Sequence, residues 1–140
     1  MADQKKIEEL IDIAIEMTKK SYAPYSGFTV GAALLTKDGR IFTGCNIENA
    51  AYTPTNCAER TAFFKAVSEG VREFSAIAIA GGQNGIISQV TAPCGVCRQV
   101  MMEFCDSDTF EIYMAVDKSN YKKATLKELL PEGFGPANLT

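Results

Sequence analysis

Residues 28–47 have the sequence FTVGAALLTKDGRIFTGCNI, which predicts a β-hairpin inside the fold. The eight residues from Phe28 to Leu35 are nearly all apolar or small, as expected of a buried strand. The Asp38-Gly39 pair that follows is a strong signal for a tight hairpin turn, and residues 41–47 then predict the returning strand. A hairpin this apolar has to be covered by other elements of the chain.

The flanking sequence supplies those elements. Ile7, Leu10, Ile11 and Ala14 recur at helical spacing and predict a helix over residues 5–20. Downstream, the pattern predicts helices at 57–69, 93–104 and 125–130, strands at 74–80 and 110–116, a weak or absent strand at 121–124, and a flexible loop at 81–85. This order predicts an α/β layered fold, one sheet covered by helices, in a single domain spanning residues 1–140.

Composition excludes several classes of protein. A net charge of -3 and a pI near 5 argue against a nucleic-acid groove or an anionic membrane surface. No apolar run approaches the roughly 20 residues of a membrane span. The first residues lead into an amphipathic helix rather than an apolar signal core, so we expect a cytoplasmic, reducing setting. There, five cysteines indicate metal binding or buried thiols before disulfides.

Three of the cysteines have the spacing of a metal site. Cys57 is followed 37 residues later by the pair Cys94 and Cys97, and the chain has no histidine that could act as a ligand or base. Cys57 and Cys94 begin predicted helices, where the partial positive charge favours a thiolate. Three thiolates leave an open fourth position for water, the pattern of a catalytic zinc. A structural site with Cys45 or Cys105 as fourth ligand, and a redox dithiol, are the alternatives.

Charged residues beside these cysteines complete the hypothesis. Glu59 lies two residues after Cys57 and is not needed as a ligand, so we expect it to be the general acid and base. Three thiolates would blunt the acidity of a zinc-bound water. We therefore expect Arg60, three residues after Cys57, and Arg98, directly after Cys97, to hydrogen-bond a sulfur and withdraw charge.

Further along the hairpin, Asn46 and Glu48 are two residues apart, so in an extended segment they share a face. They either bind a ligand or simply cap the strand end. Phe28 and Phe134 are, as residue types, more often core than ligand contacts.

At these residues the sequence resembles the small, homotetrameric type of cytidine deaminase. The resemblance covers nearly the whole chain. Its carriers are residues 24–26 (PYS), 30–34 (VGAAL), 44–50 (GCNIENA), 57–62 (CAERTA), 93–100 (PCGVCRQV), 129–131 (LLP) and 134–136 (FGP). In combination these motifs are far more specific than any one of them. The family's fold is a three-layer α-β-α arrangement with a five-stranded mixed sheet between helices.

The resemblance implies a role for each matched position. Cys57, Cys94 and Cys97 match the ligands of one zinc ion per subunit, Glu59 matches the proton shuttle, and Arg60 matches the charge-neutralising arginine. The matched substrate contacts are Phe28 against the pyrimidine, Asn46 and Glu48 at the ribose hydroxyls, the Ala58 amide and the Ala92 carbonyl at the base, and Phe134, which reaches a neighbouring subunit's site.

The implied reaction is the hydrolytic deamination of cytidine and 2′-deoxycytidine to the uridines with release of ammonia, a step of pyrimidine salvage. The implied assembly is a homotetramer with sites shared between subunits. The Glu48 carboxylate can accept from a sugar hydroxyl but repels phosphate, which favours nucleosides over nucleotides. The Gly-rich loop from Gly81 to Thr91 matches no family pattern and has no assigned role.

Two other functions compete with this one. A blasticidin-S-type deaminase shares the zinc and glutamate elements, but the 46–50 stretch and the tail with Phe134 favour the nucleoside enzyme. A non-catalytic structural-zinc module would need Cys45 or Cys105 as a ligand and would make Glu59 dispensable. Nucleic-acid-editing deaminases are disfavoured by the acidic charge balance.

Overall fold

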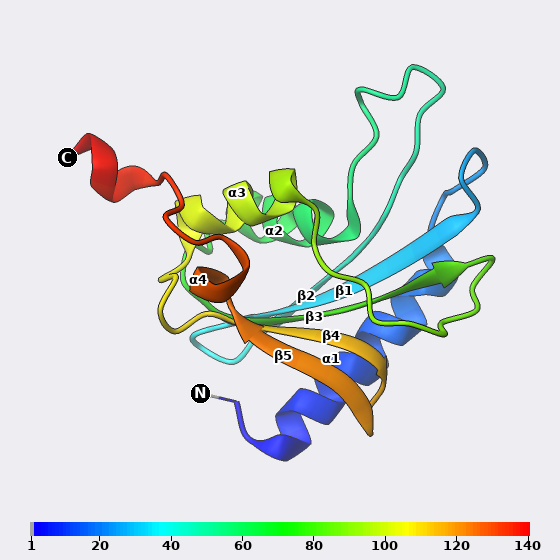
Figure 1. Ribbon diagram of the computed structural model, residues 1–140, viewed down its shortest axis with the longest axis horizontal. Coiled ribbons are helices and arrows are strands. Elements are labelled where there is room, and N and C mark those ends of the chain that lie inside the picture. Colours follow the sequence, from blue (N-terminus) through cyan, green and yellow to red (C-terminus); the bar gives the residue numbers. More distant parts are fainter. Residues whose placement is uncertain (1) are drawn as a thin grey trace.

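A computed structural model describes residues 2–140 and contains a five-stranded mixed sheet in the order β2-β1-β3-β4-β5 (Figure 1). Neighbouring strands are antiparallel except for β3 and β4, which are parallel. The bounds are β1 Phe28–Thr36, β2 Ile41–Cys45, β3 Phe74–Gln83, β4 Glu111–Asp117 and β5 Asn120–Thr125. The predicted hairpin is confirmed as β1 and β2, with Gly39 at a φ of 92° in the turn.

Helices cover both faces of the sheet, which confirms the three-layer α-β-α prediction (Figure 1). Helix α1 (Gln4–Met17) packs on one face, and α2 (Ala58–Ser68) with α3 (Gly95–Phe104) packs on the other. Side chains alternate between the two faces along each strand. On β1, Ala32 and Leu34 join the α2–α3 side while Ala33 and Leu35 join the α1 side.

Two strand predictions were wrong. Gly81 to Gln83, expected to be a flexible loop, continue β3 because they pair with Phe28 to Val30 of β1. The strand expected to be weak or absent at 121–124 is a full strand, β5, paired along β4. In both cases a partner strand supplies the ladder hydrogen bonds, which outweigh the weak local preference. The partner of Gly81 to Gln83 is distant in sequence, whereas β5 pairs with β4, the strand that directly precedes it.

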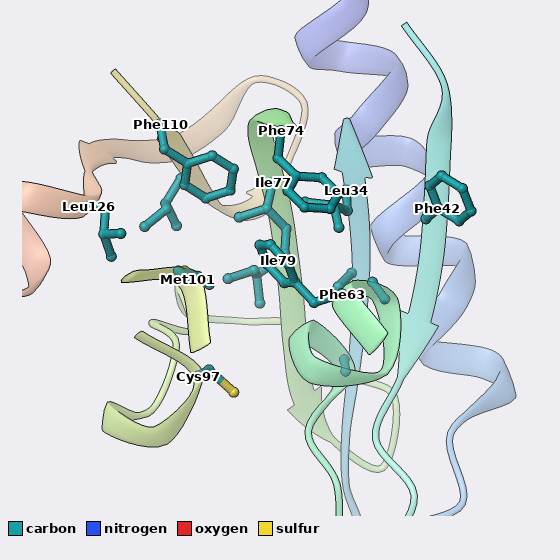
Figure 2. Close-up of a cluster of buried hydrophobic side chains, with 14 of the residues drawn as sticks. Leu34, Phe42, Phe63, Phe74, Ile77, Ile79, Cys97, Met101, Phe110 and Leu126 are labelled. Atoms are coloured by element: carbon teal, nitrogen blue, oxygen red, sulfur yellow. The ribbon is translucent and has the colours of Figure 1, made fainter. Parts of the chain in front are cut away.

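The core beneath α2 and α3 is aromatic at the end away from the cysteines (Figure 2). Phe63 of α2 meets Phe74 edge-on at 5.0 Å between ring centroids and lies 6.1 Å from Phe110. All three rings are buried. This packing fixes α2 on the sheet and therefore fixes the place where its N-terminus, with Cys57 and Glu59, emerges.

Shorter elements close the fold. A 3₁₀ turn (Thr18–Lys20) extends α1, so the predicted helix over 5–20 is confirmed in two pieces. Helix α4 (Leu126–Leu129) starts with a capping box formed by Thr125 and Glu128, and it confirms the helix predicted at 125–130. A 3₁₀ turn (Pro136–Leu139) ends the chain on a segment that leaves the body of the domain (Figure 1). Within residues 2–140, none of the helices has the length and apolar character of a membrane span.

Gly44 sets the distance between β2 and the start of α2. A Cβ at this position would overlap the carbonyl oxygen of Ala58 and lie 2.7 Å from the amide nitrogen of Ala62. Gly44→Ala is therefore expected to push α2 outward and lower the free energy of unfolding by about 1–3 kcal/mol or more. Urea unfolding measures this change. In Gly95→Ala the new Cβ meets nothing within 4 Å, and equal losses in the two variants would contradict this account.

Candidate active site

A cavity of about 350 Å³ opens where β1, the segment after β2, and the starts of α2 and α3 converge. Its walls are Ser26, Phe28, Val30, Asn46, Glu48, Thr55, Asn56, Cys57, Ala58, Glu59, Thr91, Ala92 and Cys94. Larger hollows lie along α1, at about 490 Å³, and beside the β1–β2 turn, at about 390 Å³, but neither includes a predicted site residue. The convergence of reactive groups, rather than volume, marks the candidate site.

Three cysteines meet at one edge of this cavity. Cys57 is the N-cap of α2, Cys94 is the N-cap of α3, and Cys97 lies in the first turn of α3. Their sulfurs all lie within 4.8 Å of one another, with Cys57 and Cys94 3.8 Å apart and Cys94 and Cys97 3.5 Å apart. Zn–S bonds of about 2.3 Å at tetrahedral angles place sulfurs about 3.8 Å apart. The donor set therefore fits a zinc ion.

The other two cysteines lie apart from this cluster. Cys45 ends β2, with its thiol 3.4 Å from the Lys20 carbonyl oxygen. Cys105 follows α3 and packs against the core, where burial raises the pKa of its thiol. Within residues 2–140, Cys57, Cys94 and Cys97 are the single group of three or more potential ligands close enough to share an ion. A four-cysteine structural site has no support in this geometry.

Glu59 lies in the first turn of α2 with its side chain in the cavity wall, and it is only 4% exposed. Burial, the largest cause, and the nearby Cys57 sulfur raise its pKa to about 7. A carboxyl group with this pKa can both take and release a proton near neutral pH. Sequence spacing pointed to this residue, but its burial comes from the packing of α2.

Arg60 and Arg98 differ in their hydrogen-bond partners. Arg60 donates from Nη2 to the Cys57 sulfur at 3.2 Å, as expected, while its buried Nε has no hydrogen-bond partner. The prediction that Arg98 also bonds a sulfur was wrong. Its guanidinium donates to the carbonyl oxygens of Pro93, at 2.7 Å, and Leu129, at 2.6 Å. Arg98 directly follows Cys97 in α3, and consecutive residues of a helix point in directions about 100° apart, so Arg98 leaves the cluster and ties α3 to α4.

Hydrogen bonding selects the charged form at Cys57. The Cys97 thiol, and then the Arg60 guanidinium, hold the pKa of Cys57 well below that of a free thiol, even though burial opposes the shift. Its position at the N-terminus of α2 also favours negative charge. The site is therefore arranged to hold a thiolate.

Asn46 and Glu48 both face the cavity, as their spacing predicted. Asn46 is buried and bridges the start of β1: Oδ1 accepts from the Val30 amide and Nδ2 donates to the Phe28 carbonyl, both at 2.8 Å. Glu48 accepts from the Tyr25 amide at 3.0 Å, the Ser26 amide at 3.1 Å and the Ser26 hydroxyl. The Ser26 contacts hold the pKa of Glu48 below its usual value.

Of the remaining predicted contacts, Phe28, Ala58 and Ala92 line the cavity. Phe134 does not. It is 57% exposed on the C-terminal segment, where the Gln99 side chain donates to its carbonyl oxygen at 2.8 Å. The cavity also contains Ser26, Thr55, Asn56 and Thr91, to which we gave no role. Ser26 belongs to the 24–26 motif, a signal we had tied to no chemistry.

A buried carboxylic acid beside a three-thiolate cluster at two helix starts defines the class of hydrolases that activate water on zinc. The model of the cytidine and deoxycytidylate deaminase zinc-binding region matches residues 4–113. The chain belongs to the cytidine and deoxycytidylate deaminase family. It is therefore an enzyme that acts on C–N bonds and uses zinc.

Individual relatives agree with this assignment. A cytidine deaminase of Sporosarcina psychrophila is 48% identical over 96% of this chain and 95% of its own length, and one of Halalkalibacterium halodurans is 50% identical over 89% and 91%. The crystal structure of a Burkholderia pseudomallei cytidine deaminase superposes with a TM-score of 0.82 at 46% identity, covering 90% of this chain and 97% of that one.

Proposed function

We propose that this chain deaminates cytidine and 2′-deoxycytidine to the corresponding uridines and releases ammonia. The observation that carries the proposal is Glu59, buried in the cavity wall beside the cysteine cluster with a pKa raised to about 7. A buried carboxyl group that is not itself a metal ligand can transfer protons in a catalytic site. A structural metal site does not require such a group. The relatives from Sporosarcina psychrophila and Halalkalibacterium halodurans are named cytidine deaminases.

In this proposal Cys57, Cys94 and Cys97 hold the zinc ion. The ion supplies the Lewis acidity that lowers the pKa of a water molecule toward neutrality. Cys57 and Cys94 belong to the cavity wall, and Cys97 is almost wholly buried, so an ion that these three residues held would lie at the edge of the cavity. Arg60 partly neutralises the thiolates through Cys57.

Glu59 carries the protons through the reaction. It takes one proton from the attacking water and passes it to N3 of the cytosine ring as the C4–O bond forms. The water is now a hydroxyl group on C4. Glu59 then takes the proton of this hydroxyl group and delivers it to the amino group on C4. The C4–N bond breaks, ammonia leaves, and a carbonyl remains at C4. Glu59 ends the cycle in its starting state, as a general acid and base must.

The other cavity residues orient the nucleoside. Phe28, Ala58 and Ala92 line the cavity. In this proposal the Phe28 ring packs on the pyrimidine, and the Ala58 amide and the Ala92 carbonyl bond the base edge. Asn46 and Glu48 bind the sugar hydroxyls. Glu48 is an ionised acceptor that repels phosphate, so nucleosides are preferred to nucleotides.

We further propose that the chain works as a homotetramer in which Phe134 completes a neighbouring subunit's site. Phe134 is exposed and lies outside its own chain's cavity. Other large apolar side chains are also exposed, among them Tyr22, Tyr25, Ile47, Tyr52, Phe64 and Val96. Light scattering after size-exclusion chromatography gives the mass, and a monomer of about 15.2 kDa would contradict the assembly.

The deciding experiment follows the ultraviolet absorbance of cytidine with purified protein while zinc is assayed on the same sample. We expect the cytidine band to fall, with about one zinc per chain, the stoichiometry of a three-cysteine site. Zinc binding without any change in cytidine would contradict the proposed substrate. A sample that takes up no zinc would contradict the site itself.

Arg60→Gln tests the neutralising role. We expect zinc content to stay at the wild-type level while kcat falls by about 10- to 100-fold. Without Arg60 the thiolates would donate more negative charge to the ion and weaken its Lewis acidity. Arg72→Gln, an exposed arginine between α2 and β3, is the matched control. An unchanged rate in Arg60→Gln would remove Arg60 from the mechanism.

A further inference from the structure

The end of β3 and the residue after it contact the loop that holds Glu48. The Gln83 side chain donates from Nε2 to the Ser26 carbonyl oxygen at 2.8 Å, and the Asn84 amide donates to the Gly27 carbonyl oxygen at 2.7 Å. These two residues belong to the stretch from Gly81 to Thr91, for which the family resemblance suggested no role. Two consecutive carbonyl groups of the loop are thus held from one side.

The contact leaves little free space. Gly27 has a φ of +69°, and a Cβ there would lie 2.6 Å from Gln83 Nε2 and 2.9 Å from Asn84 Oδ1. A turn bond from the Gly27 amide to the Ala23 carbonyl, at 3.0 Å, closes the loop on itself. Gln83 therefore packs closely against this loop and supports it directly.

On its other side the same loop surrounds the Glu48 carboxylate. Oε1 accepts the Tyr25 and Ser26 amides, and Oε2 accepts the Ser26 hydroxyl. A carboxylate offers about four acceptor positions, two on each oxygen. Both positions of Oε1 are filled and one remains on Oε2. Glu48 is thus prepared to accept a single hydroxyl from a ligand in the cavity.

We propose that Gln83 is a positioning residue for the sugar site, acting through Ser26 to aim the free acceptor of Glu48 at one sugar hydroxyl. This inference rests on the proposed nucleoside substrate. Gln83 itself does not line the cavity, whereas Ser26 and Glu48 do. The effect of Gln83 is therefore confined to substrates that carry the sugar hydroxyl bound by Glu48.

The physical reason is preorganisation. Glu48 is only partly buried, so without fixed donors its side chain would lose conformational freedom each time substrate bound. Gln83 prevents this loss indirectly, because the Ser26 carbonyl that it holds belongs to the residue that supplies two of the three donors.

The test compares cytidine with 2′,3′-dideoxycytidine, which lacks both hydroxyls of the ring, in wild-type protein, Gln83→Ala, Glu48→Ala and the double variant. For Gln83→Ala we expect kcat/KM with cytidine to fall by about 3- to 10-fold, the effect of one hydrogen bond. With the dideoxynucleoside it should stay within about two-fold of wild type, and Gln83→Ala should add nothing on the Glu48→Ala background. Gln89→Ala, in the same stretch from Gly81 to Thr91, is the matched control.

Each other outcome overturns a defined part of the account. Equal losses on both substrates, or additive losses with Glu48→Ala, would show that Gln83 only supports the fold. No loss in Gln83→Ala would reject the positioning role while leaving the proposed function intact. If Glu48→Ala itself affects both substrates equally, the proposed sugar contact fails, and the positioning role fails with it. Absence of deamination in the wild-type protein would reject the proposed function.

Discussion

Glu59→Gln is expected to lower kcat for cytidine by about 10²–10⁴-fold, the usual contribution of a general acid–base group. The amide has nearly the same shape as the carboxyl group but cannot take a proton from water. Burial raises the pKa of Glu59 to about 7, so the acid is already partly neutral in the fold and the neutral amide should cost little stability. Zinc content and the unfolding transition should therefore match those of the wild-type protein.

The measurement is the loss of cytidine absorbance under saturating substrate, with zinc and circular dichroism recorded on the same samples. Glu69→Gln provides the control, because Glu69 is an exposed residue at the other end of α2. Turnover at the wild-type rate in Glu59→Gln would refute the mechanism. Loss of zinc in that variant would instead show that Glu59 is a ligand.

Cys97→Ser is expected to abolish both zinc binding and turnover. Cys97 is 1% exposed, and its sulfur lies close to those of Cys57 and Cys94. Within residues 2–140, no other potential ligand lies close enough to take the place of its sulfur. A serine hydroxyl is a far weaker ligand because it does not ionise near neutral pH. With two thiolates left, zinc per chain should fall from about one to near zero after dialysis against a chelator.

Cys45→Ser is the control, because this thiol is partly buried and lies outside the cluster. It should retain zinc and activity. Zinc is measured by atomic absorption and folding by near-ultraviolet circular dichroism. Stoichiometric zinc in Cys97→Ser, or its loss in Cys45→Ser, would mean that the ligand set is not the one proposed.

Local patterns in the sequence were enough to predict much of the fold. The apolar run of β1, the Asp38-Gly39 turn and the helical spacing of Ile7, Leu10 and Ile11 each depend on neighbours a few residues away. β5 and the last residues of β3 were missed because their stability comes from pairing with β4 and β1. The β1–β3 pairing joins segments far apart in the chain, so no short window of sequence reveals it. β5 directly follows β4, but its residues are mostly polar or charged and have a weak strand preference of their own.

The same division holds at the candidate site. The spacing of Cys57, Cys94 and Cys97, with Glu59 nearby, was sufficient to suggest a zinc site with a proton shuttle. The error over Arg98 arose because consecutive residues of a helix point in directions about 100° apart, whereas residues three apart, such as Cys57 and Arg60, share a face. Both arginines follow a cysteine region, but only Arg60 turns toward a sulfur.

The sequence alone determined which chemical groups this protein possesses and roughly where helices and strands begin, because residue type and short-range periodicity are local properties. Only the tertiary structure decided which groups meet. It buried Glu59 and so raised its pKa, and it set Gln83 against Ser26, 57 positions apart. Desolvation and contacts between distant segments depend on the packed arrangement of the whole sheet with its helices, and no local pattern encodes them.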